Sequence, residues 1–309
     1  MFNKHLDYLP LVTIVTPSLN QGRFIKDTIE SVLEQNYSKI EYIIIDGGST
    51  DNTISILREY DDRIKWISEK DKGQTEAINK GWRMGKGQIL AWLNSDDIYL
   101  PGAITHAVDY LNSNQNVIMV YGEGWHIKEN GEIIDRYPSE PFNLMRLAET
   151  CYICQPTVFF RKELLDKIGY LNEDLNYCMD YDFWIRTAKK YSIGYTNKYL
   201  AKSRLYAETK TLGHQVEVCK EVMDTMHNHF GSVALPWIHS YCIALIGKNC
   251  QSNTIGELRY ILFFAYLFLI NYLKYNKKLT RSVFSYCSNM IRKYFASLWN
   301  RGGNFHVFF

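Results

Sequence analysis

The chain lacks any strong excess of one charge. Its 35 Lys and Arg residues nearly balance its 33 Asp and Glu residues, which leaves a formal net charge of +2. No bulk electrostatic attraction to nucleic acid follows from this balance, so we expect no nucleic-acid partner. Residues 1–10 contain no apolar run of the kind found in secretory signals, so we expect a cytoplasmic location.

Two phosphate-binding signatures are also missing. No G-x-G-x-x-G follows the first expected strand and no G-x-x-x-x-G-K-[ST] occurs, so the chain has neither a dinucleotide fingerprint nor a P-loop. The seven cysteines are scattered and odd in number, and Cys151 and Cys154 form a CxxC pair without a second pair. This pattern favours free thiols in a reducing compartment over a zinc or redox centre.

The first part of the chain instead alternates β-rich and helical segments. Apolar runs at 11–15, 40–45, 64–67 and 89–93 are separated by segments with helical spacing, and the strands recur every 24 to 29 residues. This spacing predicts βαβ units with right-handed crossovers. We therefore expect an α/β fold with a Rossmann-like, mostly parallel sheet flanked by helices. A chain of 309 residues has room for one large core with an appendage, or for two small domains.

Four polar residues, Asn94-Ser95-Asp96-Asp97, follow the strand expected at 89–93 and precede a Pro101-Gly102 turn. Two adjacent carboxylates thus lie at the carboxyl end of a strand, where open α/β sheets bind ligands. Neighbouring carboxylates repel each other unless a positive charge lies nearby. A divalent cation that also binds a diphosphate fits this place, and a solvated acidic turn is the alternative.

Three loops should meet at this edge of the sheet: residues 16–22, 46–51 and 94–97. An Asp at a strand end can accept hydrogen bonds from a base or a ribose. Small residues such as Ser18 and Gly48 allow a ligand to approach the backbone closely. The three loops together predict a nucleotide site.

Five ordered segments within residues 10–212 carry a family resemblance: VTIVTPSLNQGRFIKDTIESVLEQNY, EYIIIDGGSTDNT, DKGQTEAINKG, ILAWLNSDD and MDYDFWIR. Together they resemble the family 2 glycosyltransferases, which have a GT-A fold. The resemblance implies a nucleotide-sugar donor, a divalent cation (Mn²⁺ or Mg²⁺) and inversion at the anomeric carbon. It also implies a GT-A domain over residues 1–212, with a nucleotide-sugar half at about 10–100 and an acceptor half at about 101–212.

The resemblance further implies roles for individual residues. Asp97 would ligate the metal, and Asp180 stands at the position of the general base. Asp46 would contact the base and Asp96 the ribose or the sugar. The nucleotide-binding set is Thr16, Pro17, Ser18, Asp46, Gly73, Asn79 and Asp96.

A base is also what the chemistry requires, because a hydroxyl loses its proton as it attacks a sugar. Asp180 lies in Met179-Asp180-Tyr181-Asp182, at the start of an expected helix. A carboxylate there is stabilised by the helix dipole by about 0.3–1 kcal/mol. This purely structural role is the alternative for Asp180, and it is the interpretation favoured for Asp182.

The sequence departs from the family pattern at four positions. Asn94 and Gly47 stand where Asp is common, Met179 replaces a common Glu, and Tyr206 stands where many relatives have a His that can reach the metal. One carboxylate remains at each critical place. The second protein ligand of the metal is left open.

Residues 120–178 should shape the acceptor side. Trp125-His126-Ile127 and Ile133-Ile134 flank Glu129-Asn130-Gly131, which predicts a hairpin. Trp125 and His126 could stack on a sugar and hydrogen-bond to it, or could be an ordinary hairpin aromatic and an exposed His. The candidate donor or acceptor contacts are Trp125, His126, Gln155, Asp182, Arg204, Tyr206 and Lys210.

Residues 213–309 have a different composition, with helices expected at 216–229, 237–246 and 260–273. The segment 260–273 is uncharged, and Lys274, Lys277, Lys278, Arg281, Arg292 and Lys293 follow it among aromatic residues. Fourteen apolar residues are fewer than the ~20 that a spanning helix needs. An interfacial helix pair on the inner face of the membrane would have this pattern. A packed helical hairpin or a contact in a homo-oligomer are the alternatives.

Together these features predict an inverting glycosyltransferase of bacterial surface-polysaccharide type. It would move a sugar, with UDP-sugars favoured, to a hydroxyl of a glycan or of a lipid-linked acceptor. A sugar nucleotidylyltransferase is a rival, but it would have a Gly-rich loop with Arg and Lys after the first strand. A non-catalytic nucleotide-sugar-binding scaffold is a second rival, supported only by the four departures.

Overall fold

The computed structural model describes residues 9–249, 257–281, 283–289 and 292. The chain divides into two compact units. The first unit comprises residues 1–147 and 151–213, and the second comprises residues 148–150 and 214–309. In the described ranges, no helix combines the length and the apolar character needed to cross a membrane.

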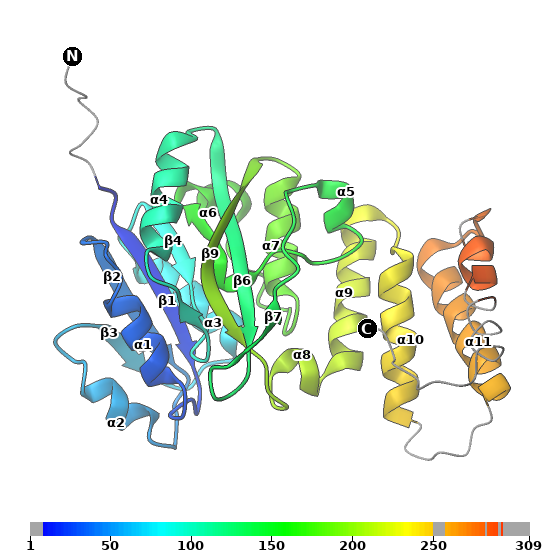
Figure 1. Cartoon of the computed structure of the whole chain (residues 1–309), viewed down its shortest axis with the longest axis horizontal. Helices are drawn as coiled ribbons and strands as arrows, with labels where there is room; N and C mark the ends of the chain where they lie inside the picture. Colours follow the sequence, from blue (N-terminus) through cyan, green and yellow to red (C-terminus); the bar gives the residue numbers. More distant parts are fainter. Residues whose placement is uncertain (1–8, 250–256, 282, 290–291, 293–309) are drawn as a thin grey trace. The chain divides into compact units, whose positions relative to one another are not determined.

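The first unit contains a nine-stranded sheet, as far as the described residues show. One half consists of neighbouring parallel strands in the order β3 (Lys65–Ser68), β2 (Ile40–Asp46), β1 (Val12–Ser18) and β4 (Ile89–Trp92) (Figure 1). Because Ser18 pairs with Asp46, and Asp46 with Ser68, these strands end at the same edge. The expected βαβ units with parallel strands are confirmed in this part of the sheet.

Helices connect and cover these strands. They are α1 (Ile25–Leu33), α2 (Thr53–Arg58), α3 (Gln74–Met84) and α4 (Ala103–Ser113). In α1, Ile25, Ile29 and Val32 are fully buried because they recur on one helical face. Gly81 lets α3 approach β1, since a Cβ at this position would lie only 2.4 Å from Val15 Cγ1.

The other half of the sheet makes it mixed rather than purely parallel. Strand β8 (Phe159–Arg161) is antiparallel to both β4 and β6 (Val117–Ile127), whereas β6 and β9 (Ser192–Arg204) are parallel. Strand β5 (Ile98–Tyr99) pairs with β9, and β7 (Ile133–Arg136) forms the expected hairpin with β6. The shorter elements are α5 (Leu144–Leu147), η1 (Gln155–Thr157), α6 (Glu163–Ile168), α7 (Met179–Ala188) and α8 (Lys210–Gly213).

A buried aromatic cluster joins β4 to α7. The Trp92 and Trp184 rings stack with centroids 5.4 Å apart, and Trp82 of α3 meets Trp92 edge-on at 5.3 Å. Each of these side chains is at most 1% exposed, and burial of one large apolar side chain is worth roughly 1.5–3 kcal/mol. The cluster thereby holds α7 against β4.

The second unit is helical in the part that the structure describes. Its helices are α9 (Gln215–Phe230), α10 (Leu235–Asn249) and α11 (Glu257–Asn276), which confirms the three expected helices. α10 packs against both α9 and α11. Lys293, one of the cations noted in the sequence, lies outside the described residues.

Candidate active site

A cleft of about 610 Å³ lies in the first unit at the carboxyl ends of β1 and β4. Its lining comes from segments that are far apart in the sequence. They are the loop after β1, the start of α3, the loop after β4, the β6–β7 hairpin, η1, the start of α7 and the end of β9 with the residues after it.

Asp97 is held rigidly in this cleft. Its side chain is buried, its Oδ1 accepts a hydrogen bond of 2.9 Å from the Arg204 backbone N–H, and its Oδ2 accepts one of 3.2 Å from Asn94 Nδ2. Its backbone carbonyl accepts a hydrogen bond of 2.8 Å from Thr28 Oγ1. The loop after β4 is thus tied to both α1 and β9.

Asn94 connects three walls of the cleft. Besides Asp97, its Nδ2 donates to Gln155 Oε1 at 3.0 Å, and its Oδ1 accepts from Gln74 Nε2 at 2.8 Å. Gln155 in turn donates to the Trp92 carbonyl at 3.0 Å. An Asp in place of Asn94 would lose both donated hydrogen bonds, so this departure from the family pattern has a structural consequence in the cleft.

Asp96 also lines the cleft, and its Oδ2 accepts a hydrogen bond of 2.8 Å from the Tyr206 hydroxyl. The buried Arg204 guanidinium contacts the Asp96 backbone carbonyl at 2.9 Å. Burial raises the pKa of Asp96, and burial followed by repulsion from Asp96 raises the pKa of Asp97. Asp97 is buried and the adjacent Asp96 is half-buried, and two such neighbouring carboxylates become fully ionised when a cation lies against them.

Asp180 opens α7 and faces the same cleft. Burial first, and then the Asp180 carboxylate, raise the pKa of the Cys151 thiol. Asp182, by contrast, is buried and accepts a hydrogen bond of 2.7 Å from Arg186 Nε, outside the cleft lining. Two carboxylates in one helical turn therefore have different surroundings.

Several other predicted residues also line the cleft. His126 lines it, and the His126 Nδ1 lies 2.7 Å from Asp135 Oδ1. Lys210 lines it, and the Lys210 Nζ donates to the Asn176 carbonyl at 2.8 Å. The predicted residues that line the cleft are Pro17, Ser18, Gly73, Asp96, Asp97, His126, Gln155, Asp180, Arg204, Tyr206 and Lys210.

Four more predicted residues lie outside the cleft lining. Asp46 accepts hydrogen bonds of 3.0 and 2.9 Å from the backbone N–H groups of Gly48 and Ser49, so it shapes its own loop. Thr16 bonds to Tyr42, and Asn79 donates to the Leu171 carbonyl at 2.9 Å.

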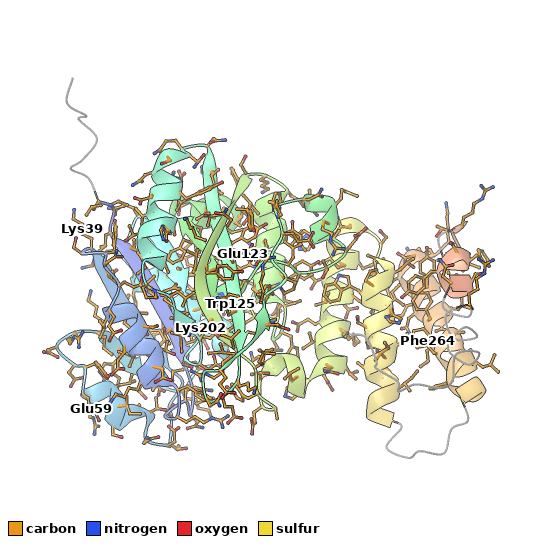
Figure 2. The ribbon with its side chains drawn as sticks, viewed as in Figure 1. Lys39, Glu59, Glu123, Trp125, Lys202 and Phe264 are labelled. Carbon is orange, nitrogen blue, oxygen red and sulfur yellow. The ribbon has the colours of Figure 1, made fainter. Side chains whose placement is uncertain are left out.

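Trp125 is the fourth of the predicted residues that lie outside the cleft lining. It stacks on Tyr199 with centroids 4.5 Å apart. Successive residues of a strand point to opposite faces, so Trp125 points away from the side on which His126 meets the cleft. Figure 2 shows Trp125 on β6 with Lys202 on the neighbouring β9.

The cleft is also lined by residues that were not predicted from the sequence, including Asp71, Gln74, Tyr137 and Tyr177. Asp71 also lies beside Gly47, where a Cβ would be 2.9 Å from Asp71 Oδ2. The Asp71 carboxylate thus occupies space beside the position where relatives often carry a second Asp. Its place in the quoted DKGQTEAINKG segment was the available signal.

Comparisons with known proteins identify related sequences and folds. The family model described as glycosyl transferase family 2 matches residues 13–169. An uncharacterized glycosyltransferase, RP339 of Rickettsia prowazekii, is 32% identical over 225 residues, which cover 68% of this chain and 69% of that protein. Chondroitin synthase of Escherichia coli is 28% identical over 228 residues, which cover 73% of this chain but only 32% of the synthase.

Solved structures of similar fold include Staphylococcus aureus TarS and a mannosyltransferase. Staphylococcus aureus TarS 1–349 in complex with UDP-GlcNAc has a TM-score of 0.56 at 17% identity, over 83% of this chain and 80% of that chain. The mannosyltransferase PcManGT from Pyrobaculum calidifontis, in complex with GDP-Man and Mn²⁺, has a TM-score of 0.58 at 16% identity, over 96% and 89% of the two chains. The expected GT-A fold is confirmed, and the family match over more than half of the chain shows that this protein is a member of glycosyl transferase family 2.

Proposed function

We propose that the protein transfers a sugar, with inversion, from a nucleotide diphosphate to a hydroxyl of a glycan or lipid-linked acceptor. The carrying observation is one cleft that holds Asp96 and Asp97 at the end of β4 and Asp180 at the start of α7. The two places supply what the reaction needs: a site for the diphosphate and a base for the acceptor. Synthesis of a cell-surface polysaccharide is the role that we propose for this activity.

Asp180 is proposed as the general base. Asp180 lies in the first turn of α7, where the helix dipole stabilises a carboxylate. The stacked Trp92 and Trp184 rings restrict movement of α7, and a rigid support keeps a base within reach of its substrate. As the acceptor oxygen attacks the anomeric carbon, its proton passes to Asp180 and the bond to the diphosphate breaks.

The carboxylates after β4 fit a divalent cation. They are hard oxygen donors, and their burial beside each other raises both pKa values, so a bound cation would relieve their repulsion. We propose that Asp97 holds Mn²⁺ or Mg²⁺ and that diphosphate oxygens and water complete its shell. In the part of the chain that the structure describes, no group of three or more His, Cys, Asp or Glu side chains could hold a metal ion by itself. When bound, the cation would neutralise charge on the departing diphosphate.

The remaining lining suggests how the cleft is shared. Residues of about 10–100, including Ser18, Asp71 and Gly73, would hold the nucleotide sugar. Residues of about 101–212, including His126 and Tyr137, would face the acceptor. The Asp135 contact orients the His126 ring, which then has a second nitrogen available for a sugar hydroxyl.

A donor screen tests the proposal. Purified full-length protein is incubated with UDP- and GDP-sugars, with Mn²⁺ or Mg²⁺, and released nucleotide diphosphate is measured. We expect release from one donor class, with UDP-sugars favoured, and a stabilisation of ~2.7 kcal/mol when that donor is at a hundredfold excess over Kd. Release of pyrophosphate from a nucleoside triphosphate would identify a nucleotidylyltransferase instead. Donor binding without turnover, in the presence of glycan and lipid-linked acceptors, would identify a scaffold.

A further inference from the structure

The second unit carries an unusual distribution of charge. After Glu257 the chain contains no Asp or Glu, but it contains Arg259, Lys274, Lys277, Lys278, Arg281, Arg292, Lys293 and Arg301. Those eight cations more than account for the net charge of +2, so the preceding part of the chain is net negative. The segment after Glu257 is basic, whereas the preceding part of the chain is acidic. This separation of charge points to a binding partner other than the nucleotide-sugar donor.

One face of α11 is committed to packing within the second unit. Phe264, Phe268, Tyr272 and Tyr275 recur at helical spacing and are buried. Phe264 meets His239 of α10 with ring centroids 5.2 Å apart, and Figure 2 shows it between the two helices. The Tyr275 hydroxyl donates to Asp224 Oδ1 of α9 at 2.6 Å. These contacts fix which side of α11 faces outward.

The outward side is apolar as well. Leu262, Tyr266 and Ile270 are 62%, 60% and 45% exposed, and Phe263 and Leu273 are each 43% exposed. We call these five residues the apolar row. They lie within the uncharged segment 260–273. A solvated helix face normally carries charged residues, so an exposed row of this kind indicates a surface that another apolar phase covers.

Basic side chains continue from the end of the apolar row. Lys274, Lys277, Lys278 and Arg281 are all exposed. Leu279 and Phe284, at 47% and 60% exposed, lie among them. The nearby Asp224 carboxylate already pairs with Lys220 at 2.7 Å. An apolar row that ends in cations without acidic neighbours in the sequence matches a lipid surface with anionic headgroups.

We propose that the apolar row and these four cations form a docking surface for an anionic phospholipid bilayer. A second copy of the chain fits less well. A two-fold contact through the row would bring equivalent cations toward each other with no carboxylates after Glu257 to pair with them. On a bilayer, the same cations meet phosphate groups while the Tyr266 ring sits at the headgroup level.

Vesicle co-sedimentation of the full chain tests this docking surface. Wild type should bind vesicles of phosphatidylcholine with phosphatidylglycerol and should bind phosphatidylcholine alone much more weakly. Replacing Leu262, Tyr266 and Ile270 by Ser should reduce partitioning by roughly 100-fold or more, because three apolar side chains no longer enter the bilayer. The matched control replaces Ile133, Ile134 and Met145 of the first unit by Ser, since these are also exposed apolar residues, and should bind as wild type does.

A charge variant provides a second, independent measurement. Replacing Lys277, Lys278 and Arg281 by Gln should weaken binding to the anionic vesicles ~100-fold, since each cation contributes roughly fivefold. Removing Lys26, Lys190 and Lys198, three exposed cations of the first unit, should have little effect. Circular dichroism and thermal melting confirm that each variant is folded.

The possible results separate the partners. The docking surface is supported if wild type is monomeric by light scattering and binds vesicles, and if both variants lose this binding. A different result would be that wild type does not bind vesicles and is a dimer, whereas the Ser variant is a monomer. The apolar row would then bind a second copy of the chain, and the proposal would be overturned. The proposal is also overturned if both variants bind the anionic vesicles as strongly as wild type does. None of these measurements depends on sugar transfer, so they stand apart from the proposed function.

Discussion

The Tyr206 hydroxyl donates a hydrogen bond of 2.8 Å to Asp96 Oδ2 and thereby joins the segment after β9 to the loop after β4. The Tyr206 ring also lies against Phe24, with centroids 5.1 Å apart, and beneath the Arg23 guanidinium at 4.7 Å. The resemblance leads us to expect a metal-reaching His at this position. The tyrosine reaches a carboxylate instead, so its contribution to the site should pass through Asp96.

We predict that Tyr206→Phe raises the KM for the donor about tenfold, the effect of one hydrogen bond to a charged group, with a smaller change in kcat. The ring contacts with Phe24 and Arg23 remain, so the thermal midpoint should stay close to that of wild type. Steady-state kinetics over a donor series measure this effect. Tyr199→Phe is the control, because Tyr199 stacks on Trp125 away from the cleft. An unchanged KM with a lowered melting temperature would assign Tyr206 a purely structural role.

Asp97→Ala should abolish transfer and also weaken binding of the nucleotide diphosphate when Mn²⁺ is present. The reason is that the substitution removes the carboxylate that we propose as the cation ligand. Calorimetric titration of UDP with and without Mn²⁺ measures the binding, and the metal should cease to matter in the variant. Wild type should lose activity in excess EDTA and regain it with Mn²⁺ or Mg²⁺. Full activity of wild type in excess EDTA would show that transfer does not need the metal.

Asp180→Asn should lower kcat by ~10²–10⁴, the usual contribution of a positioned base, and leave donor affinity nearly unchanged. Asp182→Asn is the matched control on the same helix. It weakens the buried pair with Arg186, whose Nη1 and Nη2 donate to the Ile168 and Tyr170 carbonyls, so it should lower stability more than kcat. Single-turnover kinetics and thermal melts distinguish the two effects. Loss of donor binding in Asp180→Asn would make that residue a ligand rather than the base.

Glu41→Gln should change how stability depends on pH. Burial alone would raise the pKa of Glu41, but hydrogen bonds from Lys65, the Lys86 backbone N–H and Thr13 outweigh it and hold the pKa below its ordinary value. A carboxyl group whose pKa is lowered by folding stabilises the protein above its unfolded-state pKa. That stability is lost as the pH falls through the lower, folded-state pKa.

The free energy of unfolding of Glu41→Gln should therefore fall below that of wild type by about 1–3 kcal/mol at pH 7. The difference should shrink as the pH drops from about 5 toward the folded-state pKa. Urea titrations at several pH values measure it. A difference that stays constant over this range would attribute the loss to packing instead of to the ionised carboxylate.

Sequence patterns predicted the elements of the first unit well because those elements depend on local information. The apolar spacing of Ile25, Ile29 and Val32 defines a helix face, and the run 89–93 defines a buried strand, whichever neighbours they meet. The pairing of β6 with β9 and the antiparallel direction of β8 were not foreseen. They depend on pairing with strands that lie far away in the sequence, which no local period encodes.

The same distinction holds for the site. The chain alone determined that Asp96 and Asp97 follow a strand, that Asp180 begins a helix and that 260–273 is uncharged. Only the tertiary structure decided that Asp97, Asp180 and Asp71 face one cleft. It also decided that Asp46 and Asn79 form hydrogen bonds with backbone groups. The physical reason is that hydrogen-bond partners and burial are set by segments that folding brings together. The sequence determines which chemical groups are available, and packing determines which of them face a substrate.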